Sequence, residues 1–592
     1  MSYGYCPSRL ARLWRRSELA LALPGLPALI LYLASSGAAA YGQVSVTTAQ
    51  YGNLRANANQ NEINLSAKNV NTATFGRLFS RSVDDSIYAL PLYVSNLEIP
   101  DSGVHNVVYV ATMSNTVYAF DADDPAQSKP LWFRNLGSAP AVSGDVQTHW
   151  GILGTPVIND GVMYLVANVA ESIESWSLRL FALDITTGAD AFGPPSEILF
   201  PFLDGLVPAT PFTIQRAGLL VANNALYIGF ANFQLNPPNQ SSQEGFVFSY
   251  ALNDITQPIH RFQVTNGQRG DVWQAGRGLA ADEEGNVYVS TGNGFYDGVA
   301  NFADSVLRFD PSLDLVDWYT PDDWPLLYQN NLDLSASGPV LIPGTDYLVA
   351  GSKEGVLYLL RRSALGRLQG SDSGGAVQSF LATNGCHLIS CSQTLSLTYW
   401  DRPGLNGALY VWDRRDYLRA FLFDGNYIQA DPWQIGTLTS ESIGGITVSA
   451  NGITPGTGLV WATTTADNPD QTIVHGTLRV FDALNLQNEL WNSDLMPEQD
   501  SVGNFTKFAA PVVANGKVYV VTQSNQLQVY GLLSAACDVN QDGQVNIEDV
   551  QLVIDEILGE LPPTNDVNGD GQVNVLDLQM VINASLGKGC GA

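Results

Sequence analysis

The sequence predicts an all-β fold, a propeller of eight four-stranded antiparallel blades. The first observation is the stretch at residues 107–121, VVYVATMSNTVYAFD, in which apolar and polar residues alternate as in half-buried strands. Similar stretches recur at intervals of roughly 50–70 residues, which is a blade period. They end at or near Asp184, Asn253, Asp310, Arg361, Phe421, Asp482 and Gly531. A four-stranded blade cannot bury both of its faces alone, so we expect the blades to stack around a channel.

Composition supports β structure in an exported, globular protein. The chain has 592 residues, enough for one large repeat domain and a small second domain. Only 14% of the residues are charged and 55 are glycine, which favours β structure rich in turns. The net charge of −29 argues against a nucleic-acid partner, because no basic surface offsets phosphate repulsion.

The N-terminus has the pattern of a secretory signal peptide, residues 1–40. Four arginines precede an apolar run at residues 19–34, and small residues end in Ala38-x-Ala40. An uncleaved membrane anchor is the alternative. No other apolar run is long enough to span a bilayer, so we expect no stable membrane span after signal removal and a secreted or extracellular protein, the cell surface included.

The remaining cysteines form an even set, which in an exported protein predicts two disulfides. Cys6 lies in the signal peptide, and proximity pairs Cys386 with Cys391 and Cys537 with Cys590. A zinc site that uses the first pair is the alternative, but it lacks an evident fourth ligand.

The two ends of the repeat region are expected to close the ring. Residues 41–72 are rich in Asn and Gln and are expected to form a poorly ordered polar leader. Residues 73–83 read as a single outermost strand, and the last repeat has only three strands. Pairing Arg77–Ser82 with Val518–Tyr530 would complete one composite blade and hide two open edges. The predicted propeller therefore spans residues 73–533.

The repeat resembles that of pyrroloquinoline-quinone (PQQ) propellers. The tracts GILGTPVINDGVMYLVAN and GDVWQAGRGLAADEEGNVYVSTGNG are similar to a group of exported bacterial PQQ-like propeller proteins, over most of residues 73–533. In PQQ alcohol dehydrogenases a disulfide between adjacent cysteines, a Trp platform, calcium ligands and an Asp base surround the cofactor. This chain has no adjacent cysteine pair. PQQ is therefore a cofactor that the resemblance allows but that we do not expect.

Several polar residues are placed where strands would reach the mouth of the channel. Turn capping and hydrogen bonds between blades are the simplest interpretation, because Asp, Asn and Gly suit tight turns. A ligand-binding mouth and a working dehydrogenase are the alternatives, and no catalytic residue can be assigned. The residues are His149, Trp150, Asp271, Trp273, Gln274, Arg277, Asn293, Asp304, Asp333, Lys353 and Glu354.

Two acidic loops after the ring predict two calcium ions. Ca²⁺ prefers six to eight oxygen ligands, which loop positions 1, 3, 5, 7, 9 and 12 supply. Gly543 and Gly571 provide the sharp turn at position 6, and position 12 is Asp instead of Glu. The predicted ligands are Asp538, Asn540, Asp542, Gln544, Asn546 and Asp549 in the first loop, and Asp566, Asn568, Asp570, Gln572, Asn574 and Asp577 in the second.

Each loop leads into an apolar pattern of helical period, with Gly559 placed to end the first helix. Two loop–helix units with Asp at position 12 resemble a type I dockerin, over residues 537–592. The resemblance implies a protein partner such as a cohesin-like module. Positions 10 and 11, often Ser-Thr in cellulosomal dockerins, are Ile547-Glu548 and Val575-Leu576 here. This departure favours a different partner, such as a surface protein or another copy of the chain, or packing against the ring.

The leading hypothesis is a secreted, calcium-binding, non-catalytic protein. Its propeller would be a binding or assembly platform, and its dockerin-like tail would attach it to a protein partner or assemble it with itself. One alternative is a PQQ-dependent sugar or alcohol oxidoreductase. Another is an accessory module in extracellular polysaccharide breakdown, although no paired catalytic carboxylates can be assigned.

Overall fold

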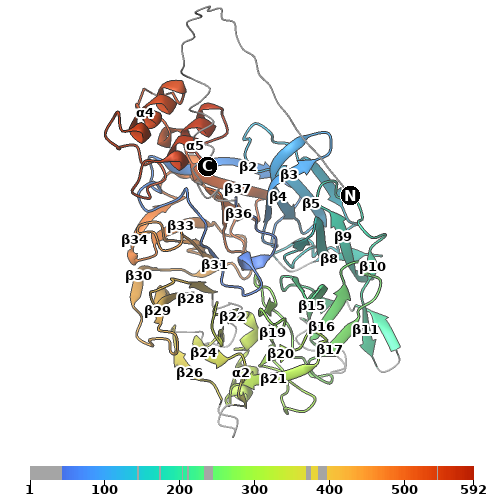
Figure 1. Cartoon of the computed structure of the whole chain (residues 1–592). Coiled ribbons are helices and arrows are strands. Elements are labelled where there is room, and N and C mark those ends of the chain that lie inside the picture. The colour runs from blue at the N-terminus through green and yellow to red at the C-terminus, as the bar shows by residue number, and fades with distance from the viewer. Residues whose placement is uncertain are drawn as a thin grey trace, which may run out of the picture. The chain divides into compact units, whose positions relative to one another are not determined.

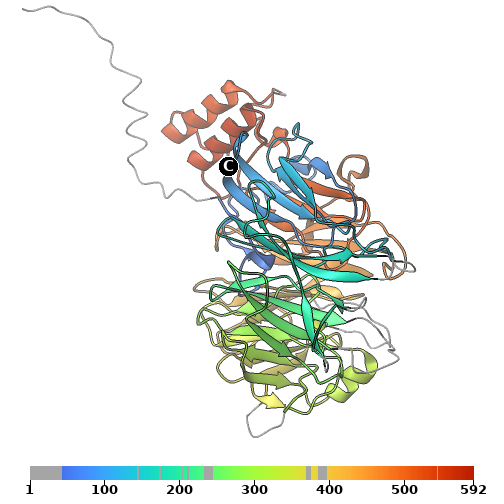
Figure 2. The ribbon, with the colours of Figure 1, turned by 90° about the vertical axis from the view of Figure 1, so that its right-hand side faces the viewer.

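The alternating repeats form eight antiparallel sheets that follow one another around a ring, as the colour gradient shows (Figure 1; a second view is Figure 2). The computed structural model describes residues 43–142, 146–172, 175–202, 205–209, 213–232, 244–368, 375–383, 396–542 and 544–591. The predicted signal peptide and the predicted Cys386–Cys391 disulfide lie outside these residues. In the described part of the chain, no helix is long and apolar enough to cross a membrane.

The first four blades have their inner strand first in the chain. Blade 1 contains β3 (Leu92–Ile99), β4 (Gly103–Ala111), β5 (Thr116–Asp121) and β6 (Trp132–Asn135); blade 2 contains β7 (Val157–Asn159), β8 (Val162–Ala170), β9 (Trp176–Asp184) and β10 (Ser196–Glu197). The hairpin of β11 (Leu199–Phe202) and β12 (Gly205–Pro208) follows. Blade 3 contains β13 (Thr213–Ile214), β14 (Leu220–Ala222), β15 (Ala225–Asn232), β16 (Phe246–Ala251) and β17 (His260–Gln263). Blade 4 contains β18 (Ala280–Ala281), β19 (Val287–Ser290), β20 (Val306–Phe309) and β21 (Leu315–Thr320), with β25 (Arg367–Leu368) added in parallel.

The remaining blades repeat this order. Blade 5 contains β22 (Val340–Leu341), β23 (Tyr347–Gly351), β24 (Val356–Arg361) and β26 (Gln378–Leu381); blade 6 contains β27 (Ser396–Trp400), β28 (Gly407–Trp412), β29 (Tyr417–Phe423) and β30 (Gln434–Thr439). Blade 7 contains β31 (Ser442–Ser449), β32 (Leu459–Thr465), β33 (Thr477–Asp482) and β34 (Asn485–Asn492). Blade 8 contains β35 (Val512–Ala514), β36 (Lys517–Val521) and β37 (Gln526–Leu532). Connecting helices are α2 (Trp324–Asn330), η3 (Leu334–Ala336), α3 (Pro497–Asp500) and η4 (Ser534–Ala536).

The predicted closure of the ring is confirmed. Strand β2 (Phe75–Ser82) pairs antiparallel with β37 and is the fourth strand of blade 8, with Arg77 opposite Tyr530 and Ser82 opposite Gln526. Among the described residues the apolar core divides into eight clusters, one at each interface between neighbouring blades. The cluster between blades 8 and 1 contains Tyr93 and Tyr519, so the closing interface is packed like the others.

The leader is ordered, so the expectation of disorder is wrong for residues 43–72. It contains η1 (Ala49–Tyr51) and β1 (Ala58–Asn59), which adds in parallel to β31. The leader hydrogen-bonds the inner part of every blade, one after another: Val46 with Tyr93, Thr47 with Ile158, Asn53 with Val221 and Ala281, Leu54 with Leu341, Ala56 with Tyr399, Asn57 with Val448, and Asn59 with Val513. The backbone of the leader and the side-chain amides of Asn53 and Asn59 therefore satisfy backbone groups of the inner strands.

The C-terminal part forms two helices, α4 (Ile547–Leu558) and α5 (Val575–Ser585), as the sequence predicts. Gly559 ends α4 in the left-handed conformation, with φ 76°. The predicted disulfide Cys537–Cys590 is present, with a Cα–Cα distance of 5.7 Å. The apolar core of this part is continuous with the cluster between blades 7 and 8, because Val553 and Met580 belong to the same cluster as Phe75.

Candidate functional sites

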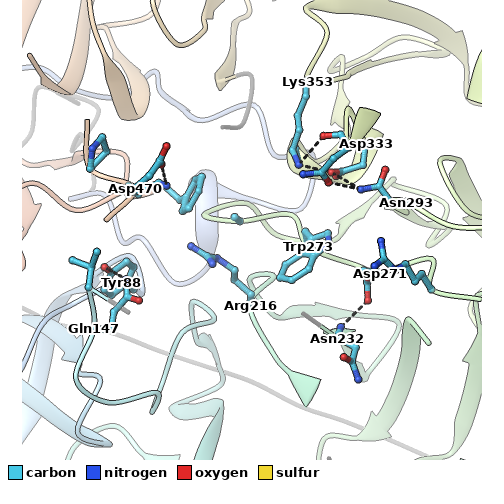
Figure 3. Close-up of a pocket in the computed structure, with 18 of the residues that line it drawn as sticks. Tyr88, Gln147, Arg216, Asn232, Asp271, Trp273, Asn293, Asp333, Lys353 and Asp470 are labelled. Atoms are coloured by element: carbon cyan, nitrogen blue, oxygen red, sulfur yellow. Dashed lines mark hydrogen bonds and ion pairs between the residues drawn. The ribbon is translucent and has the colours of Figure 1, made fainter. Parts of the chain in front are cut away.

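A pocket of about 390 Å³ lies at one mouth of the channel (Figure 3). Its residues Arg216, Trp273 and Phe508 lie in the segments just before the inner strands β14, β18 and β35. The leader instead bonds residues of those strands themselves, such as Val221 and Ala281. The two ends of the channel therefore differ. One holds the leader and the other holds a pocket large enough for a small ligand.

One side of the pocket is a buried polar network. The Asp333 carboxylate pairs with the Lys353 ammonium at 2.5 Å, and both side chains are largely buried. Asn293 donates to Asn331 at 2.6 Å, while its own side-chain carbonyl oxygen is buried and finds no hydrogen-bond partner in the described part of the chain. Burial raises the pKa of Asp271 to about 7, against the opposing effect of the hydrogen bond from the Asn232 backbone N–H. This wall can exchange a proton near neutral pH.

The other side of the pocket is positively charged and aromatic. The Arg216 guanidinium lies 4.4 Å from the centre of the Phe508 ring, a cation–π arrangement. The Lys507 ammonium pairs with Asp470 at 2.7 Å, and Arg414 pairs with the same carboxylate at 2.7 Å. Burial would raise the pKa of Asp470, but the hydrogen bonds from Lys507 and Arg414 outweigh it and lower the pKa to about 2. Asp470 therefore stays ionised.

Five of the predicted mouth residues line this pocket, namely Asp271, Trp273, Asn293, Asp333 and Lys353. The others have structural partners, as the simplest interpretation expects: His149 pairs with Asp85, Trp150 packs on Trp176, Gln274 donates to Gly278, Arg277 donates to Leu397, Asp304 accepts from Leu334, and Glu354 accepts from Tyr358. Sequence reasoning missed Arg216, Asp470, Lys507 and Phe508. Arg216 precedes the inner strand β14, and Lys507 and Phe508 precede the inner strand β35. This position before an inner strand is the feature of the sequence that could have identified them.

The second acidic loop is closed by backbone N–H groups that donate to its first and last aspartates. Gly571, at position 6, donates its N–H to Asp566 Oδ2, at position 1, over 2.8 Å. The other oxygen, Asp566 Oδ1, is buried and has no hydrogen-bond partner among the described residues. The Asp577 side chain, at position 12, is buried and accepts the N–H groups of Val567 and Asn574, both at 2.8 Å. A hard cation fits this loop, because it would satisfy the unpartnered oxygen.

The first loop is built in the same way. Asp538 accepts the Asp542 N–H at 3.1 Å, and the buried Asp549 accepts the Asn540 N–H at 3.2 Å. Asn546 and Asn574 begin the two helices, each in a capping box with the Asp at position 12. In the described ranges, no group of three or more His, Cys, Asp and Glu side chains is placed to hold a metal ion. The oxygen atoms that the two loops could offer a metal belong to carboxylates, side-chain amides and backbone carbonyls, which are the oxygen ligands that Ca²⁺ takes.

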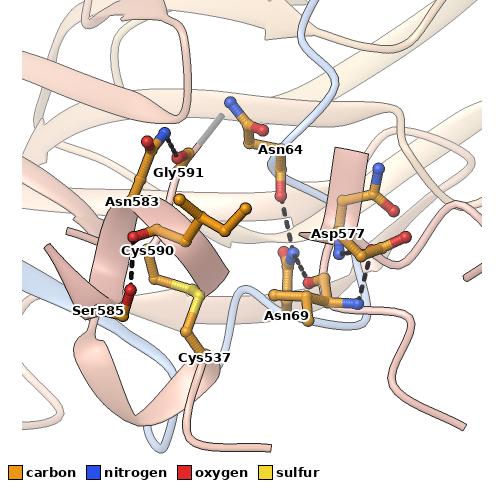
Figure 4. Close-up of a disulfide and its surroundings, with 11 residues drawn as sticks. Asn64, Asn69, Cys537, Asp577, Asn583, Ser585, Cys590 and Gly591 are labelled. Carbon is orange, nitrogen blue, oxygen red and sulfur yellow. Dashed lines mark hydrogen bonds between the residues drawn. A yellow bond between two sulfur atoms is a disulfide. The ribbon is translucent and has the colours of Figure 1, made fainter. Parts of the chain in front are cut away.

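The second loop lies against the leader. Asn69 donates to the Val567 carbonyl at 3.0 Å and to the Asn64 carbonyl at 2.7 Å (Figure 4). The Lys68 ammonium pairs with Asp566 Oδ2 at 3.0 Å. A side chain at Gly569 would collide with Ser66, since its Cβ would lie 2.3 Å from the Ser66 hydroxyl oxygen. The tail thus contacts the leader through its second loop, whereas the position-10 residues Ile547 and Val575, for which packing against the ring was the alternative, are exposed.

The molecule is therefore a closed β-propeller that carries a helical domain with two acidic loops. Residues 536–584 match the family model for the dockerin type I domain. The chain accordingly contains a type I dockerin domain behind an eight-bladed propeller, as the sequence predicts.

A solved structure with a TM-score above 0.5 supports the fold. A europium-containing methanol dehydrogenase is similar, with a TM-score of 0.53, 12% identity, and coverage of 92% of this chain and 96% of that chain. The computationally designed Ika8 protein has a TM-score of 0.44, 12% identity, and coverage of 77% and 99%. Sqt1 of Saccharomyces cerevisiae has a TM-score of 0.41, 9% identity, and coverage of 77% and 98%. A comparison with curated proteins finds no match.

Proposed function

We propose that this chain is an exported, non-catalytic attachment protein. Its dockerin domain, loaded with two calcium ions, binds a cohesin-like module on a partner protein, and its propeller is a rigid platform. The match of residues 536–584 to the dockerin type I domain carries the proposal. Export rests on the signal-peptide pattern of residues 1–40.

We propose that each calcium ion is bound by one loop, through the twelve oxygen-bearing residues that the sequence predicts as ligands. The unpartnered Asp566 Oδ1 supports this assignment in the second loop. Isothermal titration of the metal-free full-length chain with CaCl₂ tests it. We expect the unaltered chain to bind two equivalents of calcium. The variants Asp538→Ala and Asp566→Ala should each bind one equivalent. Two equivalents bound by either variant would contradict the assignment.

Attachment is tested with a recombinant type I cohesin module immobilised on a biosensor. We expect the full-length protein to bind it in calcium and to dissociate in EDTA. The double variant Asp538→Ala/Asp566→Ala is expected not to bind, while Lys129→Met, an exposed change in blade 1, binds as the unaltered protein does. Equal binding with and without calcium would contradict calcium-dependent attachment.

The pocket supports a second candidate, a PQQ-dependent oxidoreductase. Trp273 and Asp271 lie together in a pocket of about 390 Å³, within the usual range of ligand pockets. Trp273 offers a flat ring, and the Asp271 carboxyl group can hold a proton. PQQ, when bound, accepts the two electrons of an alcohol oxidation. Titration with PQQ in the presence of calcium tests this candidate, with quinone absorbance and dye reduction as the measurements. The same titration of the Trp273→Ala variant is the comparison. The absence of a quinone complex would exclude this candidate.

A further inference from the structure

Three aromatic side chains of blade 4 form a row on the surface of the propeller. Phe295 belongs to the loop between β19 and β20, and Trp324 and Tyr328 belong to α2, which follows β21 (Figure 1). The ring centres of Phe295 and Trp324 lie 6.0 Å apart, with an angle of 84° between the ring planes. Tyr328 lies one turn further along α2 on the same side as Trp324, because residues four positions apart share a helix face. The three rings therefore follow one another along the surface.

The row is open to a ligand. Phe295 is 39% exposed and Tyr328 is 43% exposed, while Trp324 is partly buried and supports the ring of Phe295. Val299 and Leu326, which belong to the same two segments, are also exposed. Apolar side chains that gather on a surface in this way mark a binding site.

The loop that presents Phe295 is held in one conformation. Asp297 Oδ1 accepts three consecutive backbone N–H groups, those of residues 299–301, at 2.8–2.9 Å. The Asn301 side chain donates to Asp297 Oδ2 at 2.7 Å and accepts the Asn266 N–H at 2.8 Å, which ties the loop to the segment after β17. A ligand that stacks on Phe295 therefore does not have to order a loose loop, and this lowers the entropic cost of binding.

The two segments that form the row are neutral or acidic. Residues 291–307 and 309–352 contain no lysine or arginine. Asp297 and Asp322 place exposed carboxylates on the same segments. An acidic ligand would be repelled by these carboxylates, so the row suits an uncharged ligand better than an acidic one.

Amide groups lie next to the row. Asn293 and Asn331 both line the mouth pocket, and they are joined by a hydrogen bond of 2.6 Å. Asn293 lies two positions before Phe295 and Asn331 three positions after Tyr328, while Gln329 is exposed on α2. Side-chain amides both donate and accept hydrogen bonds, which suits them to hydroxyl groups.

A sugar ring with equatorial hydroxyl groups, as in glucose and xylose units, combines the two properties that this surface suits. Its C–H groups cover both faces, which stack on the electron-rich faces of aromatic rings, and its hydroxyl groups surround the edge, where amides bind them. Rings set among amides and carboxylates do not form the continuous apolar centre of a protein interface. We propose that Phe295, Trp324 and Tyr328 form a binding surface for a neutral polysaccharide chain of such units. This inference gives the propeller a ligand of its own and does not depend on the dockerin domain.

The experiment is isothermal titration of the full-length, calcium-loaded protein with three hexasaccharides. Cellohexaose and xylohexaose are the neutral probes, and the hexamer of galacturonic acid is the acidic probe. The row is altered in Phe295→Ala/Tyr328→Ala. The matched control is Phe192→Ala/Tyr427→Ala, which removes the same two ring types from blades 2 and 6, where they are 47% and 56% exposed. Circular dichroism and the midpoint of urea denaturation confirm that each variant is folded.

We expect at least one neutral hexasaccharide to bind, and the acidic hexamer to bind about tenfold more weakly or less. Phe295→Ala/Tyr328→Ala should weaken the binding of the neutral sugar by about tenfold or more, because two stacking rings are lost, whereas the control should change it by less than about twofold. Binding of neither neutral sugar, equal losses in the two variants, or equal affinity for the acidic hexamer would overturn the proposal.

Two further measurements separate this inference from the proposed attachment. The calcium-loop variant Asp538→Ala/Asp566→Ala should bind the neutral sugar as the unaltered protein does, even though it is expected not to bind the cohesin module. Loss of cohesin binding by Phe295→Ala/Tyr328→Ala, in a protein that binds no sugar, would assign the row to a protein contact and overturn the proposal while leaving attachment intact.

Discussion

At the scale of single residues, Arg55 is a buried side chain of the leader with partners in two blades. It is fully buried, and its guanidinium donates to the carbonyl oxygens of Leu279 at 2.6 Å and Leu219 at 3.2 Å. It also donates to Thr48 and Ala49 of its own segment. Burial, with the neighbouring Arg277 adding to it, lowers the pKa of Arg55 to about 9. One side chain thus joins the leader to the residues that directly precede the inner strands of blades 3 and 4.

Replacing Arg55 should therefore destabilise the ring strongly. Arg55→Met leaves several buried carbonyl oxygens without donors, at about 1–3 kcal/mol for each unsatisfied group. We expect the free energy of unfolding to fall by about 3 kcal/mol or more, measured by urea denaturation followed by tryptophan fluorescence. Arg134→Met, which removes a partly exposed pair with Asp190, is the control and should cost less than about 1 kcal/mol. Equal losses in the two variants would contradict a central role for Arg55.

Asp271 predicts a dependence of stability on pH. In the folded protein burial raises its pKa to about 7, with the nearby Asp333 adding to the effect and Arg269 opposing it, whereas the unfolded chain titrates near 3.8. The folded state thus binds more protons between these values, so the stability falls as the pH rises from about 4 to 7. Asp271→Asn removes that loss.

We expect the stability of Asp271→Asn relative to the unaltered protein to rise by about 2.5–3 kcal/mol from pH 5 to pH 8, since the loss runs over about two pH units and one pKa unit corresponds to about 1.4 kcal/mol. Urea denaturation at both pH values measures the difference. Asp254→Asn is the control, because the hydrogen bond from the Thr256 side chain lowers the pKa of Asp254 and leaves it ionised over this range. If the free energies of unfolding of Asp271→Asn and the unaltered protein differed by the same amount at both pH values, the raised pKa of Asp271 would be refuted.

At the scale of elements, the leader shows what sequence patterns leave out. The strands of each blade could be predicted because their alternation is local. The leader has no such alternation, and its low hydrophobicity indicates disorder. Its order comes from partners far along the chain, such as Val513 for Asn59 and Ile446 for Asn57. Nothing local in the leader marks those long-range hydrogen bonds, so only the assembled ring reveals them.

The contact between leader and dockerin predicts an effect on calcium binding. The Lys68 ammonium lies 3.0 Å from Asp566, a proposed ligand of the second loop. A positive charge there opposes a bound cation, so Lys68→Met should tighten calcium binding to the second loop. We expect a change of about two- to fivefold, because Lys68 is largely exposed and its charge is screened. Calcium titration of the Asp538→Ala background isolates this loop, and Lys129→Met in the same background is the control. Weaker binding in Lys68→Met would contradict the prediction.

At the scale of the whole molecule, the sequence predicts the architecture better than the pocket. Eight repeats and a lone N-terminal strand determine the closed ring, and β2 pairs with β37 as expected. The pocket depends on which loops meet at the mouth. Asp470 and Asp271 both line it, although they are far apart in the chain and belong to blades 7 and 3–4. Sequence reasoning found the residues of blades 4 and 5 near glycine-rich turns, but had no local signal for Asp470.

The apolar core of the dockerin domain is continuous with one cluster of the ring, which bears on how much of the protein unfolds when calcium is removed. Val553 and Met580 share a cluster with Trp491, while the seven other clusters of the described core contain no dockerin residue. The dockerin domain has few core residues of its own, so its folding should depend on the metal. The ring has its own apolar interfaces between blades, so its folding should not depend on the metal.

We therefore expect EDTA to open the dockerin domain and to leave the propeller folded. Limited proteolysis with intact-mass measurement tests this. In EDTA, cleavage should concentrate between Cys537 and Cys590, and the nicked fragments should stay joined until reductant breaks the disulfide between those residues. In excess calcium the same sites should be protected. Equal cleavage rates in the two conditions would show that packing against the ring, instead of calcium, maintains the domain. Cleavage within the blades would show that the metal also supports the ring.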